Sequence, residues 1–153
     1  MRKITIELAI IMVILAGCKK DDPKFPSDVQ EVLDVIVGTW ESTDTYNAEI
    51  LTFTAYQEPI DIQSASSNWP SMTFHGTFQR DFRYIGSTWI HEDYYFLIRP
   101  DKKEINAYGI TSNQTWALNP SKFYDYKIVD ENTIRLHDQD LSPLNEKVYK
   151  RKQ

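Results

Sequence analysis

From Gly38 onward the chain consists of short segments in which apolar residues recur at every second position, and this pattern constrains the fold most strongly. Met72, Phe74 and Phe78 lie on one face of such a segment, and the residues between them are mostly polar. A period of two is that of a β-strand, whose side chains point alternately to its two faces. We expect strands over residues 38–45, 49–55, 72–78, 82–90, 93–99, 104–109, 123–129, 133–137 and 147–151.

About nine short strands spaced roughly ten residues apart are typical of an antiparallel barrel or sandwich. A sheet of about eight strands can close on itself, and its interior is then filled by side chains or holds one small ligand. Buried tyrosine hydroxyls need hydrogen-bond partners, which favours a partly polar or ligand-holding interior. The side chains expected to face inward are Trp40, Leu51, Phe53, Phe74, Phe78, Phe82, Tyr84, Tyr94, Phe96, Ile105, Tyr124, Tyr126, Ile134 and Leu136.

One short helix is expected before the first strand. Ser27 and Gln30 have the spacing of a capping box, and the helix is expected to end at Gly38. We interpret this helix as a plug that packs against the domain rather than as a helix that binds a partner. Its apolar residues recur at helical spacing, and they are Val29, Val32, Leu33 and Ile36.

Gly38 and Trp40 open the first strand directly after this helix, and they resemble the G-x-W motif of lipocalins and the wider calycin group. The last strand, residues 147–151, resembles that of small lipocalin-like domains in lipoproteins of Bacteroidetes-type bacteria. The resemblance covers residues 27–153 and implies a mostly β fold, an up-and-down antiparallel barrel of about eight strands. It also implies that Trp40 packs across the closed end of the barrel, with the guanidinium of Arg151 within about 6 Å of its ring. The Thr-Asp-Tyr motif of true lipocalins is missing from its usual place.

The N-terminus carries a pattern of a different kind. Arg2 and Lys3 precede ten uncharged, mostly apolar residues, 8–17. Ten helical residues rise only about 15 Å, half the thickness of a hydrocarbon core, so this run indicates a secretory signal rather than a membrane span. The run ends in a sequence that resembles the lipobox of bacterial lipoproteins, Leu15, Ala16, Gly17 and Cys18.

The lipobox implies a signal peptide of residues 1–17, a lipidated tether of residues 18–26 and a barrel domain of residues 27–153. Acyl chains on Cys18 would attach the protein to a membrane, since several chains anchor far more strongly than one. Residues 19–22 are two lysines and two aspartates, and they are similar to the signal that sends Bacteroidetes-type lipoproteins to the cell surface. We therefore expect an outer-membrane anchor, with periplasmic or surface orientation left open.

The composition excludes several classes of function. The chain carries 17 Lys and Arg against 22 Asp and Glu, and phosphate binding needs a basic face, so no nucleic-acid partner is expected. A single cysteine excludes a disulfide framework and a multi-cysteine zinc site. The motifs of serine hydrolases, metalloproteases and phosphate-binding loops are missing, and the three histidines lack metal-ligand spacing. We expect no catalytic residue, no metal and no cofactor, and an enzyme is the least favoured hypothesis.

Two long stretches without a clear strand pattern, residues 56–71 and 110–121, are expected to border the mouth of the barrel. The favoured hypothesis is a lipid-anchored binding protein that holds a small apolar or amphipathic molecule in the barrel. The alternative is a barrel with a solid core that binds a protein or a surface glycan, for example as a hydrolase inhibitor or accessory lipoprotein. The oligomeric state stays open. The candidate ligand-binding residues are Tyr84, Tyr94 and Tyr126 in the barrel, with Trp69 and Trp116 in the loops.

Overall fold

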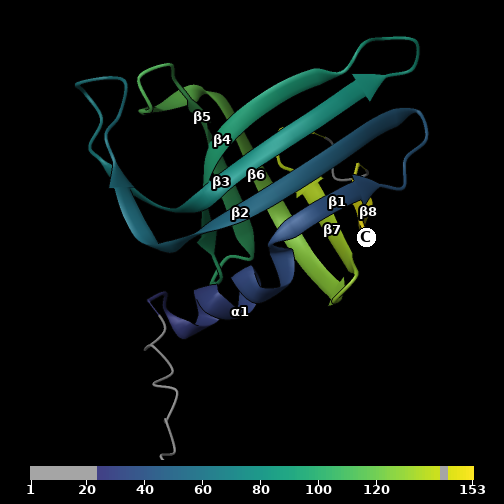
Figure 1. Ribbon diagram of the computed structural model, residues 1–153, viewed down its shortest axis with the longest axis horizontal. Helices are drawn as coiled ribbons and strands as arrows, with labels where there is room; N and C mark the ends of the chain where they lie inside the picture. The colour runs from purple at the N-terminus through teal and green to yellow at the C-terminus, as the bar shows by residue number, and fades with distance from the viewer. Residues whose placement is uncertain (1–23, 142–144) are drawn as a thin grey trace, which may run out of the picture.

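The computed structural model describes residues 24–141 and 145–153, which form a closed antiparallel barrel (Figure 1). Each strand pairs with its neighbours in the sequence and β8 returns to β1, which confirms the expected up-and-down barrel with a short N-terminal helix. The signal segment and Cys18 lie outside the described residues. The elements are α1 (Ser27–Ile36), β1 (Gly38–Ser42), β2 (Asn47–Ile62), β3 (Met72–Tyr84), β4 (Ile90–Arg99), β5 (Glu104–Ile110), β6 (Trp116–Asp130), β7 (Thr133–Asp138) and β8 (Lys147–Arg151).

Two of the expected strands are in fact one. The turn expected at residues 79–81 and the separate strand at residues 82–90 are wrong, because β3 continues without a break to Tyr84. Arg80 is in the middle of β3, and its charge does not mark a turn because the carboxylate of Glu49 binds it inside the barrel. The chain turns instead around Gly86, whose φ of 78° suits a glycine. The barrel therefore has eight strands rather than nine.

The barrel interior is filled with side chains. Of the side chains expected there, three are placed differently: Phe82 is only partly buried, Tyr84 is 58% exposed, and Phe74 belongs to a second cluster outside the barrel. Tyr126 is partly buried and packs against the interior cluster. The others are buried as expected, and they are Trp40, Leu51, Phe53, Phe78, Tyr94, Phe96, Ile105, Tyr124, Ile134 and Leu136.

The helix α1 covers one end of the barrel, which we call the closed end; it lies below the sheet in Figure 1. Its apolar face is buried in the interior cluster, as expected for a plug. The expected capping box is wrong, because Ser27 is the first helical residue and no described side chain caps the helix. The carbonyl of Pro26 accepts the N–H of Gln30 at 2.9 Å instead.

Trp40 and Arg151 join the helix to the sheet at the closed end. The guanidinium carbon of Arg151 lies 4.3 Å from the centroid of the Trp40 ring, within the expected 6 Å. The Trp40 indole N–H donates to the carbonyl of Ile36 at 2.7 Å. Arg151 also donates to the carbonyls of Val35 and Val37, at the helix end where acceptors lack intrahelical partners and the dipole favours a cation.

The hairpin of β2 and β3 bends away from the barrel wall near Gly76. The register of the two strands shifts between Ala55 and Ile60, and the pairing of β3 with β4 begins at Gly76. A Cβ atom at Gly76 would lie 2.1 Å from the carbonyl oxygen of Thr54 and 2.7 Å from the Phe96 ring, so this close approach requires a glycine. The outer half of the hairpin then packs onto outward-facing residues of β4 and β5 in the second cluster, which contains Phe74, Tyr95, Tyr108 and Trp116.

Candidate functional site

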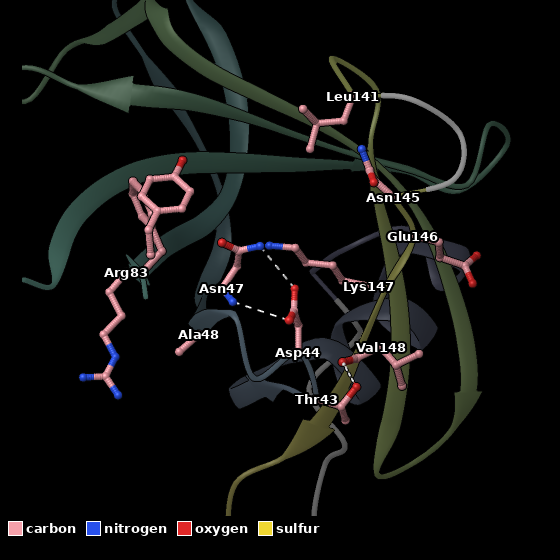
Figure 2. Close-up of a pocket in the computed structure, with 12 residues that line it drawn as sticks. Thr43, Asp44, Asn47, Ala48, Arg83, Leu141, Asn145, Glu146, Lys147 and Val148 are labelled. Carbon is pink, nitrogen blue, oxygen red and sulfur yellow. Dashed lines mark hydrogen bonds between the residues drawn. The ribbon is translucent and has the colours of Figure 1, made fainter. Parts of the chain in front are cut away.

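The end of the barrel away from α1, the open end, carries a pocket of about 550 Å³ (Figure 2). It lies where β1 ends at Ser42, because β2 and β8 on either side of β1 extend further toward this end. The volume is within the range of small-molecule sites. We call it the rim pocket, and its lining residues are Thr43, Asp44, Asn47, Ala48, Phe82, Arg83, Tyr84, Leu141, Asn145, Glu146, Lys147 and Val148.

Asp44 holds the loop between β1 and β2 at one wall of the rim pocket. Its Oδ1 accepts the backbone N–H of Tyr46 at 2.9 Å, and its Oδ2 accepts the side-chain amide of Asn47 at 3.4 Å. The bond from Tyr46 is the main cause that lowers the pKa of Asp44, so its carboxylate is charged at neutral pH. The N–H of Thr43 donates to the carbonyl of Val148 at 2.9 Å and ties the loop to β8. This wall of the pocket is therefore preformed.

The floor below the rim pocket is charged. Glu49 is 2% exposed and accepts hydrogen bonds from Arg80, from Lys147 Nζ at 2.7 Å and from the Tyr149 hydroxyl at 2.8 Å. Burial opposes ionisation of Glu49, but the charges of Arg80 and Lys147 outweigh it and lower the pKa of this carboxyl. Glu49 is therefore the anion that connects β2, β3 and β8 at the open end. In Figure 2 the side chain of Lys147 reaches from β8 toward Asn47.

Arg80 extends this network to β4. Its Nη1 donates to Oε2 of Glu92 at 3.0 Å, and the same oxygen accepts the hydroxyl of Tyr94 at 2.6 Å. Burial lowers the pKa of an arginine, but the charge of Glu49 raises the pKa of Arg80 overall, so it stays protonated. Burial, followed by the bond to Glu92, raises the pKa of Tyr94, which is therefore a neutral phenol.

A small recess of about 20 Å³ adjoins the rim pocket. Leu141, Asn145 and Lys147 line both volumes. Tyr124 also lines the recess and is 3% exposed, and its hydroxyl has no hydrogen-bond partner among the residues that the structure describes. The other residues of the recess are Glu49, Leu136, Asp138 and Tyr149.

The five candidate ligand-binding residues lie in separate places, not around one mouth as expected. Tyr84 lines the rim pocket. Tyr94 is fully buried below it. Tyr126 lines a different groove, of about 790 Å³, beside α1 at the closed end. Trp69 and Trp116 contact each other near the turn of the β2–β3 hairpin, with ring centroids 6.3 Å apart.

The two long segments do meet, but on the outside of the barrel rather than at its mouth. The N–H of Trp116 donates to the carbonyl of Gln63 at 3.0 Å, and Ser64 forms a β-bridge with Trp116. Trp116 is 1% exposed and packs against Tyr108 at a centroid distance of 5.3 Å, whereas Trp69 is 52% exposed. Trp116 is therefore a core residue of the second cluster.

The charged floor depends on residues that sequence reasoning missed. Glu49 precedes the inward-facing Leu51 by two positions. Arg80 lies between Phe78 and Phe82, both of which were expected inside. A charge at an inward position of a strand is costly unless it is paired. Two such charges on consecutive strands are the signal that could have located this network.

Residues 24–141 and 145–153 contain neither a cluster of metal-ligating side chains nor a helix that could cross a membrane. Within this range no group of three or more His, Cys, Asp or Glu side chains could hold a metal ion. No helix of the same range is long and apolar enough to cross a membrane.

Comparisons of the chain with protein-family models, with curated proteins and with solved structures gave no match. The geometry of the rim pocket and its charged floor is therefore the basis for a functional conclusion.

Proposed function

We propose that this protein is a lipid-anchored, non-enzymatic binding protein that holds a small amphipathic molecule in the rim pocket at the open end of its barrel. One observation carries the proposal. The barrel interior is occupied by a continuous cluster of side chains, whereas about 550 Å³ at the open end is accessible. A ligand that enters the barrel from its open end would therefore lie at the rim, above the charged floor.

The lining of the rim pocket suits a molecule with one apolar and one polar side. Phe82 and Tyr84 at the end of β3 offer aromatic surface. Asp44, Asn47 and Lys147 offer a carboxylate, an amide and an ammonium group for hydrogen bonds. The walls are held by the bonds of Asp44 and Glu49, so little ordering is needed on binding.

The lipid anchor is supported by the sequence, where Cys18 follows a secretory run and a lipobox-like pattern. Mass spectrometry of the mature protein from the membrane fraction is expected to find acyl chains on Cys18. The variant Cys18→Ser is expected to be released or to keep its signal. An unmodified thiol in a membrane-bound mature chain would refute the anchor, while binding at the rim would remain open to its own test.

Binding is tested by native mass spectrometry of protein purified from its own host, followed by extraction of the retained molecule. Ala48 lines the rim pocket, so Ala48→Trp should fill it and abolish retention. Leu118, 46% exposed on β6, provides the matched control, and Leu118→Trp should retain the molecule. Equal retention by both variants would place the ligand elsewhere.

A second candidate is the interaction module, in which the open end docks on a protein or a glycan. The observation that favours it is the turn between β3 and β4, where Ile85 is 78% exposed and Trp89 is 44% exposed. Exposed apolar groups that gather at one place are typical of interaction sites. Ile85→Glu should then abolish capture of the partner without changing retention of a small molecule in the rim pocket.

A further inference from the structure

Among the residues that the structure describes, the hydroxyl of Tyr124 has no hydrogen-bond partner, whereas the hydroxyls of two neighbouring tyrosines are paired. The hydroxyls of Tyr94 and Tyr149 donate to carboxylates at 2.6 and 2.8 Å. The Tyr124 hydroxyl has no partner in the described part of the chain, although this side chain is 3% exposed. A buried donor without an acceptor is costly, so an acceptor supplied from outside the chain would be favourable. Burial raises the pKa of Tyr124 well above its usual value, so the hydroxyl remains a donor at neutral pH.

The recess beside Tyr124 has room for such an acceptor. Glu49 and Asp138 line the recess together with Tyr124, and their charges add to the effect of burial in raising the pKa of Tyr124. A single water-sized group needs about 10–15 Å³ of such space. The recess measures about 20 Å³ and so admits one hydroxyl-sized group.

The charges around the recess are balanced, and this selects the chemistry of its occupant. Glu49 is paired with Lys147 at 2.7 Å, and Asp138 with Lys122 at 3.1 Å. A cationic group would meet Lys147 and an anionic group would meet the two carboxylates, so either would be buried against a like charge. A neutral hydroxyl avoids both, because it can accept from Tyr124 and donate to a lone pair of Asp138.

We propose that the recess is a subsite for a neutral hydroxyl group, carried by a ligand whose remaining part lies in the rim pocket. This inference rests on the proposed function and narrows its ligand to an uncharged amphiphile with a terminal hydroxyl. Leu141, Asn145 and Lys147 line both volumes, so the hydroxyl reaches the recess from the rim pocket. The apolar part of the ligand then lies against Phe82 and Tyr84.

The test compares four probes that share a linear hydrocarbon chain and differ at one end: 1-hexanol, its methyl ether, hexanoate and hexylammonium. Binding to the folded barrel is measured from chemical-shift changes of backbone amides at the open end in NMR titrations. We expect 1-hexanol to bind at least about tenfold more tightly than either charged probe, because a buried unpaired charge is costly. The ether lacks the donor and is too large for the recess, so it should also bind more weakly.

Variants assign this preference to the recess. Tyr124→Phe removes the hydroxyl and should weaken the binding of 1-hexanol about three- to tenfold, the usual effect of one hydrogen bond, while binding of the ether is unchanged. Tyr95→Phe is the matched control, because Tyr95 is also a buried tyrosine but belongs to the second cluster and lines neither the rim pocket nor the recess. This control should bind 1-hexanol and the ether as the wild type does.

Three results of these titrations would overturn the subsite. Tyr124→Phe could bind 1-hexanol as tightly as the wild type, which would mean that the recess holds water only. A charged probe could bind as tightly as the alcohol, or 1-hexanol could fail to bind up to its solubility limit. The Ala48→Trp variant distinguishes failure of the hydroxyl subsite from failure of the proposed binding function. If a molecule extracted from the native protein lacks a hydroxyl but still requires the open rim pocket, the binding function stands and the subsite falls.

Discussion

The closed and open ends of the barrel each place an arginine beside an aromatic ring, yet the two arginines have different partners. At the closed end, Arg151 lies 4.3 Å from the Trp40 ring and donates to main-chain carbonyls of the helix end. At the open end, Arg80 lies 3.9 Å from the Phe82 ring and donates to two carboxylates. The first arginine is thus bonded to the backbone, and the second to side chains.

Because of this difference, we expect the closed end of the sheet to serve mainly stability and the open end to serve binding. Carbonyl groups of the backbone do not titrate, so the stability that these contacts at the closed end contribute is independent of pH. Carboxylates removed from water carry a desolvation cost that their partners offset only in good geometry. The open end is therefore expected to add less stability per buried group, and its polar atoms are the ones that a ligand can engage.

The largest effect is expected from breaking the closed end. Trp40→Ala removes a fully buried indole together with its hydrogen bond, and should lower the free energy of unfolding by about 3–5 kcal/mol. Urea unfolding followed by circular dichroism measures the loss. Trp69→Ala is the control, because Trp69 is 52% exposed and its loss should cost less than about 1 kcal/mol. If both variants lowered the free energy of unfolding equally, the closed end would not be the main source of stability.

Breaking the charged floor should have the next largest effect. Glu49→Gln leaves Arg80 and Lys147 without their shared anion and should cost about 3 kcal/mol at neutral pH. Glu146→Gln provides the comparison, because its ion pair with Arg135 is about half exposed and should contribute no more than about 0.5 kcal/mol. If Glu49→Gln lowered the free energy of unfolding as little as Glu146→Gln does, the charged floor would not contribute to the stability of the fold.

Two tyrosines sharpen the comparison within the open end. Tyr94→Phe loses a hydrogen bond to the charged Glu92 and should cost about 1.5–3 kcal/mol. Tyr124→Phe loses no hydrogen bond in the described part of the chain, so unfolding of the ligand-free protein should change by less than about 0.5 kcal/mol. Differential scanning calorimetry of both variants measures these values. A large loss for Tyr124→Phe would show that its hydroxyl already has a strong partner.

The smallest effect is a change in pH dependence. The folded-state pKa of Glu49 is lowered, so its stabilisation is complete above the unfolded value near 4.3 and is lost as the pH falls through the folded value. One proton contributes a slope of at most about 1.4 kcal/mol per pH unit. Unfolding measured from pH 6 to pH 3 should lose stability more steeply in the wild type than in Glu49→Gln. Trp40→Ala should keep the wild-type slope, since the closed end does not titrate with it.

Much of the fold followed from short-range patterns. A period of two located most of the strands, and a helical period located α1, because both reflect the backbone geometry of a few consecutive residues. Gly38 and Trp40 marked the start of the first strand, and their resemblance to a known motif pointed to the contact with Arg151. The division of residues 72–90 failed for a related reason: Arg80 looked like a turn residue because its partner on β2 was not visible locally.

The candidate site was out of reach of such patterns. Alternation says that Glu49 and Lys147 face inward, but their contact joins residues 98 positions apart and exists because β8 closes the sheet on β1. Alternation likewise gives no information about the bend at Gly76, which brings Trp69 on the β2–β3 hairpin into contact with Trp116 on β6 at the outer wall. Strand period and helix position are thus properties of the local chain, whereas the rim pocket and its charged floor arise from closure, register and bending, which depend on contacts between distant strands.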